Sequence, residues 1–114
     1  MKIQSSEKIS KEYLDINSCG CQHFHWHDLG SLRPNGRVDY HILYIVKGCC
    51  YVTENNEEIA VPEGSVIIYL PHERQEYRFY SGTESTSYYI QFSGTGCEEL
   101  IEEFKITSQR IFYV

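Results

Sequence analysis

The residues best suited to metal chemistry are three histidines that alternate with aromatic residues in one short segment: His23, His25 and His27. In an extended chain, alternate side chains share one face at about 6.5–7 Å, so neighbouring imidazoles could share a metal ion with Cys21 or Asp28. The alternative is that Phe24 and Trp26 pack inward while the histidines face solvent. We favour this alternative, because no complete set of four ligands has tetrahedral spacing, and we expect no metal and no cofactor.

The clearest strand pattern surrounds another histidine, His41. The period of two along residues 38–46 places Val38, Tyr40, Ile42, Tyr44 and Val46 on one face and Asp39, His41, Leu43 and Ile45 on the other. Tight-turn residues separate further strand-like runs, expected at residues 50–53, 57–61, 65–70, 75–80, 85–93 and 111–114.

Two of the turns predict pairing between consecutive strands. Asn55 and Asn56 tolerate the positive φ of a tight turn, so residues 50–53 and 57–61 are expected to form a hairpin. The segment Ser81-Gly82-Thr83 predicts a second pair between residues 75–80 and 85–93. Helical spacing of Leu100, Ile101 and Phe104 predicts one short helix over residues 97–104.

The composition supports a single, strand-rich domain. The chain has 114 residues, is 41% hydrophobic and contains ten tyrosines and five phenylalanines, which favour strands. Seven or eight short strands predict an all-β fold, a small antiparallel β-barrel or jelly roll with a short C-terminal helix. Residues 1–12 are expected to be a flexible N-terminal arm, and residues 13–114 the folded domain.

Charge and cysteine content exclude several functions. The net charge of −6 opposes binding to phosphate backbones, so we expect no nucleic-acid contact by this chain. The longest apolar run is about six residues, against the roughly twenty that a spanning helix needs, so no membrane contact is expected. Five cysteines without an export signal indicate reduced thiols and a cytoplasmic location.

Four motifs in order resemble the N-terminal cupin-like domain of AraC-type transcription regulators: RPNGRVDYHILYIVKG, PEGSVIIYLP, EYRFY and STSYYIQFSGT. The resemblance covers roughly residues 13–106. It implies a domain that senses a small-molecule effector, a sugar in some members, and helps the regulator to dimerise, which leaves a homodimer open. The family binds DNA through a C-terminal pair of helix-turn-helix units. Nothing here matches those units, so DNA binding is expected only for a longer parent.

Enzymatic cupins hold a metal with three histidines and one glutamate. The glycines of the two cupin motifs show which residues of this chain stand at those four ligand positions. With Gly48 and Gly64 as anchors, the glutamate position is His41 and the last histidine position is Gln75. The paired histidine positions are Asn35 and Arg37, or Pro34 and Gly36 with one more residue of spacing. Only one of the four is a ligand type, and an arginine would place positive charge at the metal. We therefore expect no enzyme; the alternatives are a stand-alone metal-dependent cupin isomerase or dioxygenase, and a dimerisation barrel filled by its own side chains.

The expected effector pocket lies inside the barrel. Seven residues are its candidate ligand contacts: Arg33, Arg37, His41, Gln75, Tyr77, Ser87 and Tyr89. By resemblance, Arg33 contacts the ligand, Tyr77 is a pocket aromatic and Tyr89 is an aromatic platform. Periodicity disagrees at the last strand, because the face of Tyr88, Ile90 and Phe92 is the more apolar one.

Overall fold

The computed structural model describes residues 10–24 and 28–113. Nine strands and one helix follow one another: β1 (Asp15–Phe24), β2 (Leu29–Arg33), β3 (Tyr40–Lys47), β4 (Cys49–Glu54), β5 (Glu57–Pro62), β6 (Val66–Tyr69), β7 (Gln75–Phe79), β8 (Ser85–Ser93), α1 (Cys97–Glu103) and β9 (Ile111–Phe112). The predicted all-β fold with a short C-terminal helix is confirmed. No helix in the described part has the length and apolar content needed to cross a membrane.

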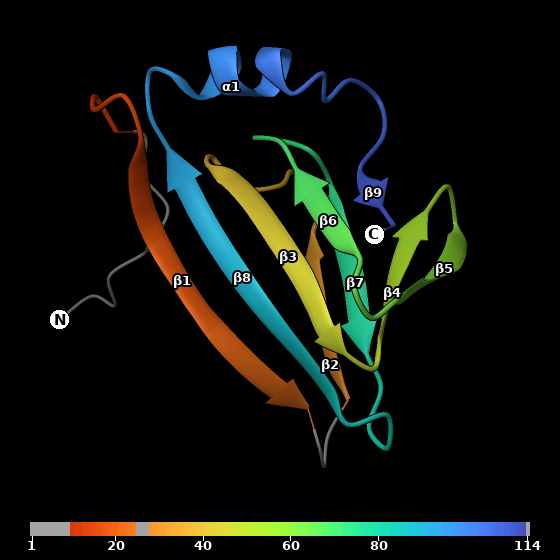
Figure 1. Ribbon diagram of the computed structural model, residues 1–114. Coiled ribbons are helices and arrows are strands. Elements are labelled where there is room, and N and C mark those ends of the chain that lie inside the picture. The colour runs from red at the N-terminus through yellow and green to blue at the C-terminus, as the bar shows by residue number, and fades with distance from the viewer. Residues whose placement is uncertain (1–9, 25–27, 114) are drawn as a thin grey trace, which may run out of the picture.

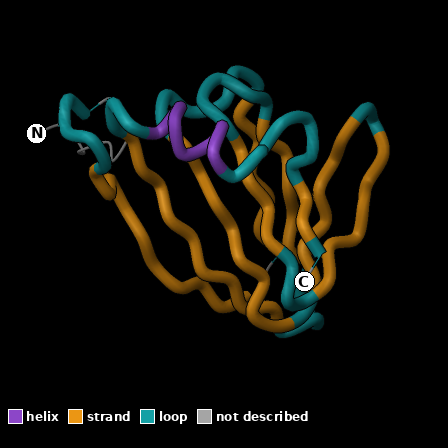
Figure 2. The backbone as a smooth tube through the Cα atoms, turned by 45° about the horizontal axis from the view of Figure 1, so that its top comes forward, coloured by secondary structure: helices purple, strands orange, loops and turns teal. Residues whose placement is uncertain are grey.

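Two antiparallel sheets build the molecule. One has five strands in the order β1-β8-β3-β6-β9, and the other has four in the order β2-β7-β4-β5 (Figure 1). Within the described residues, no strand pairing joins the sheets, so they face each other as an open jelly roll rather than a closed barrel. The helix α1 lies at one end of the strands, together with several of the loops (Figure 2).

The predicted hairpin of β4 and β5 is confirmed. Cys49 pairs with Pro62 and Glu54 with Glu57 along an unbroken register. Asn55 and Asn56 have φ angles of 51° and 64°, the left-handed values that a two-residue turn with the strands' own twist requires.

The predicted pairing of β7 with β8 is wrong. The strand β7 pairs with β2 and β4, whereas β8 pairs with β1 and β3 in the other sheet. The loop after Phe79 therefore crosses between the sheets. A crossing lets both strands turn one face to the same interior, where Phe79 and Ser85 are both buried. A short polar loop with one glycine is compatible with a crossing between the sheets as well as with a hairpin.

The core lies between the sheets, close to the loop that joins β7 to β8. Phe24 of β1 stacks on Phe79 of β7 at 4.3 Å between ring centroids, which ties one sheet to the other. The buried cluster consists of Phe24, Leu43, Ile45, Cys50, Val52, Val61, Ile67, Tyr69, Tyr77, Phe79 and Ile111. His41, Leu43 and Ile45 are buried, so the face that they share with Asp39, the residue before β3, is the inward one.

The strand β8 turns its more polar face inward. Ser85, Ser87 and Gln91 are buried, whereas Tyr88 on the opposite face is half exposed. The outer face is also apolar, with Tyr40 stacked on Phe92 at 5.3 Å between ring centroids. Because the outer face of β8 is the more apolar one, periodicity alone indicates the wrong face as the inward one. The family resemblance implies that Ser87 and Tyr89 face inward, and this is the observed orientation.

Candidate functional site

A pocket of about 260 Å³ opens between the two sheets. Its lining comes from β1, β2, β3, β7, β8 and the loop after β2: Ser18, Gln22, Arg33, Arg37, His41, Leu43, Tyr77, Tyr89 and Gln91. Five of the seven predicted contacts are in this lining: Arg33, Arg37, His41, Tyr77 and Tyr89. The fold therefore brings residues far apart in the sequence around one small space.

The other two predicted residues lie beside the pocket rather than in its lining. Gln75 is fully buried and its Oε1 accepts hydrogen bonds from Arg33 at 3.2 Å and from His41 at 3.0 Å. Ser87 is also fully buried, in register with the pocket residue Gln22 across the β1–β8 pair. Both belong to the polar interior around the pocket.

A tight turn holds the two arginines. The Gly36 amide donates to the Arg33 carbonyl at 3.1 Å and closes a turn that begins at the end of β2. Gly36 has a φ of 69°, and any Cβ there would collide with the Glu73 carbonyl oxygen. Only glycine satisfies both conditions, so the turn keeps Arg33 and Arg37 at the pocket.

The two arginines differ in their partners. The buried Arg37 guanidinium forms an ion pair with Asp39, with Nε 2.6 Å from Oδ1, and Asn17 also donates to this carboxylate at 2.8 Å. Arg33 donates to Ser31 Oγ at 2.8 Å and to the Gln75 amide oxygen, and both of these acceptors are neutral. Arg37 is thus neutralised locally and Arg33 is not.

His41 lies at the centre of the site. Tyr69, Tyr77 and Tyr89 surround its ring, with centroids 6.2–6.4 Å away. Burial lowers the pKa of His41 to about 4, and the positive charges of Arg33 and Arg37 act in the same direction. The ring is therefore neutral near pH 7.

Two buried polar atoms at this pocket have no hydrogen-bond partner in the structure: Nε2 of His41, which lines the pocket, and Nε2 of Gln75, whose Oε1 bonds to Arg33 and His41 of the lining. Each such atom costs about 1–3 kcal/mol when it is left unpaired away from water. Two of them at one cavity indicate a space built for polar contents.

Comparison with known protein families identifies the domain. The profile of the family described as AraC-like ligand binding domain matches residues 19–113, most of the chain. This chain belongs to that family.

Three bacterial proteins are among the solved structures similar to this AraC-like domain. A cupin protein from Bacteroides fragilis has a TM-score of 0.46 at 11% identity, and the match covers 81% of this chain and 84% of that one. The EutQ protein of Clostridium difficile has a TM-score of 0.47 at 12% identity over 66% of this chain. The plu4264 protein of Photorhabdus luminescens has a TM-score of 0.40 at 15% identity, with 77% of this chain and 63% of that one covered.

The AraC-like domain spans only about 55% of the EutQ chain. No curated protein sequence matches it.

Of the three clustered histidines, His23 is described, and it is not part of the pocket lining. His23 is exposed on β1, with its Nδ1 2.8 Å from Thr86 Oγ1, and Phe24 beside it is buried. His25 and His27 fall outside the described residues. Among residues 10–24 and 28–113, no group of three or more His, Cys, Asp or Glu side chains could hold a metal ion.

Sequence reasoning missed four residues of the pocket lining: Ser18, Gln22, Leu43 and Gln91. Gln91 shares its face of β8 with Ser87 and Tyr89, so the alternation could have found it. The residues of β1 gave no signal, because small and polar side chains alternate there without an apolar face.

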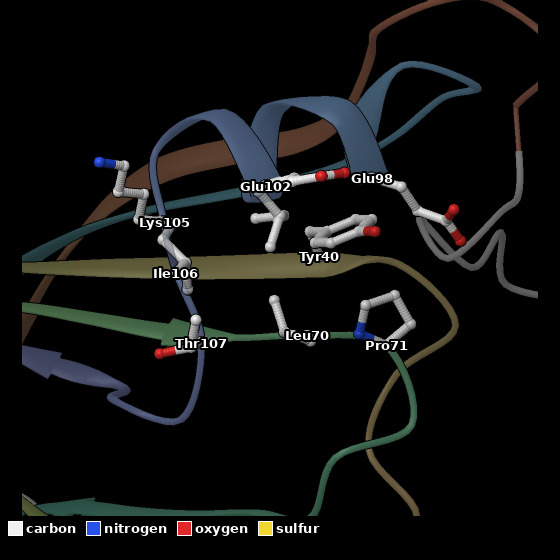
Figure 3. Close-up of a pocket in the computed structure, with 9 residues that line it drawn as sticks. Tyr40, Leu70, Pro71, Glu98, Glu102, Lys105, Ile106 and Thr107 are labelled. Carbon is white, nitrogen blue, oxygen red and sulfur yellow. The ribbon is translucent and has the colours of Figure 1, made fainter.

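A larger pocket of about 620 Å³ lies outside the sheets, between α1 and the five-stranded sheet. Figure 3 shows the Tyr40 ring beneath α1, with Leu70 and Pro71 beside it. Tyr40 neighbours His41 along β3, so the two side chains point to opposite faces. The lining of this larger, outer pocket includes none of the seven predicted contacts. We therefore take the interior pocket as the candidate functional site.

Proposed function

We propose that this AraC-like domain senses a small molecule in its interior pocket and controls DNA binding by a C-terminal domain of a longer parent. The single observation that carries the proposal is the set of unpaired polar atoms around the pocket. His41 is 1% exposed and Gln75 is fully buried, yet one ring nitrogen and one amide nitrogen lack partners. A bound effector would supply a partner for the nitrogen of His41, which lines the pocket, and be held by it.

The proposed role is regulatory and does not include catalysis. The positions that carry metal ligands in enzymatic cupins are here His41 and Gln75, together with Asn35 and Arg37, or with Pro34 and Gly36 if the spacing is one residue longer. A guanidinium in the pocket lining repels a divalent cation, and one imidazole is too few ligands to offset that.

Dimerisation and location are further parts of the proposal. We expect homodimers, as the family resemblance implies, and a cytoplasmic protein, because all five cysteines are free thiols. Sedimentation equilibrium of the longer parent, with and without effector, tests the first of these expectations.

A thermal-shift screen with sugars, sugar acids and small aromatic acids tests the sensing function. A ligand at one hundred times its Kd should stabilise the protein by about 2.7 kcal/mol. Arg33→Ala should abolish the shift, whereas Arg74→Ala, which removes an exposed guanidinium near β7, should keep it. A screen without any stabilising compound would contradict the proposal and favour a scaffold.

Metal analysis of protein purified without an affinity tag tests the enzyme alternative. We expect substoichiometric metal. One tightly held iron, manganese or zinc ion per chain would favour a cupin enzyme instead.

A further inference from the structure

The orientation of the Gln75 amide is fixed by its partner Arg33. A guanidinium only donates hydrogen bonds, so the atom that faces Arg33 Nη1 at 3.2 Å must be the amide oxygen. The Gln75 Nε2 group is therefore the atom without a partner, and it is a donor.

This orientation decides the tautomer of His41. Its Nδ1 lies 3.0 Å from the same Gln75 oxygen, which only accepts, so Nδ1 carries the proton. In the neutral imidazole the other nitrogen, Nε2, then has a lone pair and no proton. His41 Nε2 is thus a buried acceptor without a partner, and a ligand that satisfies it must donate a hydrogen bond.

The charge of the pocket adds a second requirement. None of the lining residues is acidic, and Arg37 is neutralised by Asp39. Among the described residues, Arg33 contacts only the neutral acceptors Ser31 and Gln75. One positive charge is left without a counter-charge here, in a chain whose net charge is −6.

Resting on the proposed function, we propose that the effector is a small hydroxy-carboxylate. Its carboxylate binds Arg33, and its hydroxyl donates to His41 Nε2. An ammonium group could also donate, but the positive charge of Arg33 and Arg37 disfavours it. The volume of about 260 Å³ is near the lower end for ligand pockets and suits a compound with one ring.

Matched compounds test both requirements by isothermal titration calorimetry. The probes are galacturonate against galactose, and mandelate against mandelamide and phenylacetate. We expect at least one hydroxy acid to bind at least tenfold more tightly than its uncharged partner; for mandelate, we expect the same advantage over phenylacetate, which lacks the hydroxyl. Equal affinity for charged and uncharged partners would overturn the inference, while sensing itself would stand.

The variant Gln75→Glu gives Arg33 an internal carboxylate and should reduce the preference for the anion to less than threefold. Arg74→Gln removes an exposed charge and should leave the preference unchanged. A Gln75→Glu protein that keeps the full preference would show that Arg33 does not select the anion.

Imidazole ¹⁵N NMR tests the tautomer without any ligand. At pH 7 we expect a protonated Nδ1 and a bare Nε2 for His41, with an upfield shift of Nε2 when the hydroxy acid binds. A proton on Nε2 in the free protein would overturn the inference. Binding of no compound at all, charged or neutral, would instead contradict the sensing function.

Discussion

Arg37 donates to Asp39 through Nε at 2.6 Å, and both side chains are buried. Breaking such a pair leaves an uncompensated charge in the interior, so Asp39→Asn should destabilise the fold by about 3–5 kcal/mol. Urea unfolding measures this change. Glu76→Gln, which breaks the exposed pair with Arg74, should cost less than about 1 kcal/mol. Equal costs for both variants would mean that the buried pair is not held as the structure describes.

The buried His41 should make the protein less stable in mild acid. Its folded pKa of about 4 lies below the ordinary 6.5, so the unfolded chain binds a proton that the folded chain excludes. This contribution to stability is full above pH 6.5 and is lost as pH falls toward 4, by about 3 kcal/mol in all.

Urea unfolding at several pH values, compared between the parent protein and His41→Gln, isolates this effect. The variant should lack the part of the slope that His41 causes. His72→Asn, at an exposed residue with a φ of 66°, should keep the full slope. An unchanged slope in His41→Gln would assign the acid sensitivity to other groups.

The contact between the two sheets depends on Phe79. This side chain is fully buried and stacks on Phe24, so Phe79→Ala should cost about 3–5 kcal/mol through the cavity it leaves. Phe104→Ala removes the same ring where it is 70% exposed, and should change stability by less than about 0.5 kcal/mol. Thermal unfolding of both variants gives the comparison.

Local sequence signals predicted the elements well, because each depended on residues close together in the chain. The paired asparagines at positions 55 and 56 determine a turn, and the period of two along β3 places His41, Leu43 and Ile45 on one face. The partner of each strand is a long-range property, so a short loop such as residues 80–84 could not indicate a crossing between sheets.

The candidate site could be predicted only in part, because its residues are recognisable one by one but their contacts are long-range. His41 followed from its position in the cupin motif that Gly48 closes, and Arg33, Tyr77 and Tyr89 followed from the family resemblance. What the sequence could not indicate was which polar atoms have partners. The Gln75 oxygen satisfies both Arg33 and His41 only because β2, β3 and β7 converge, although these residues are up to 42 positions apart.

Adding one methyl group to the turn between Arg33 and Arg37, by Gly36→Ala, should lower both the stability of the fold and the affinity for the effector. Gly36 and Gly82 both have positive φ angles, 69° and 86°, so alanine at either position costs about 1–2 kcal/mol in backbone strain. At Gly82 a Cβ would meet nothing within 4 Å, whereas at Gly36 it would collide with the Glu73 backbone. Gly36→Ala should therefore destabilise the fold by at least twice as much as Gly82→Ala in urea unfolding. It should also weaken effector binding at least tenfold, because relief of the collision moves the backbone that carries Arg33 and Arg37. Gly36→Ala binding with unchanged affinity would mean that this turn does not position the two guanidinium groups.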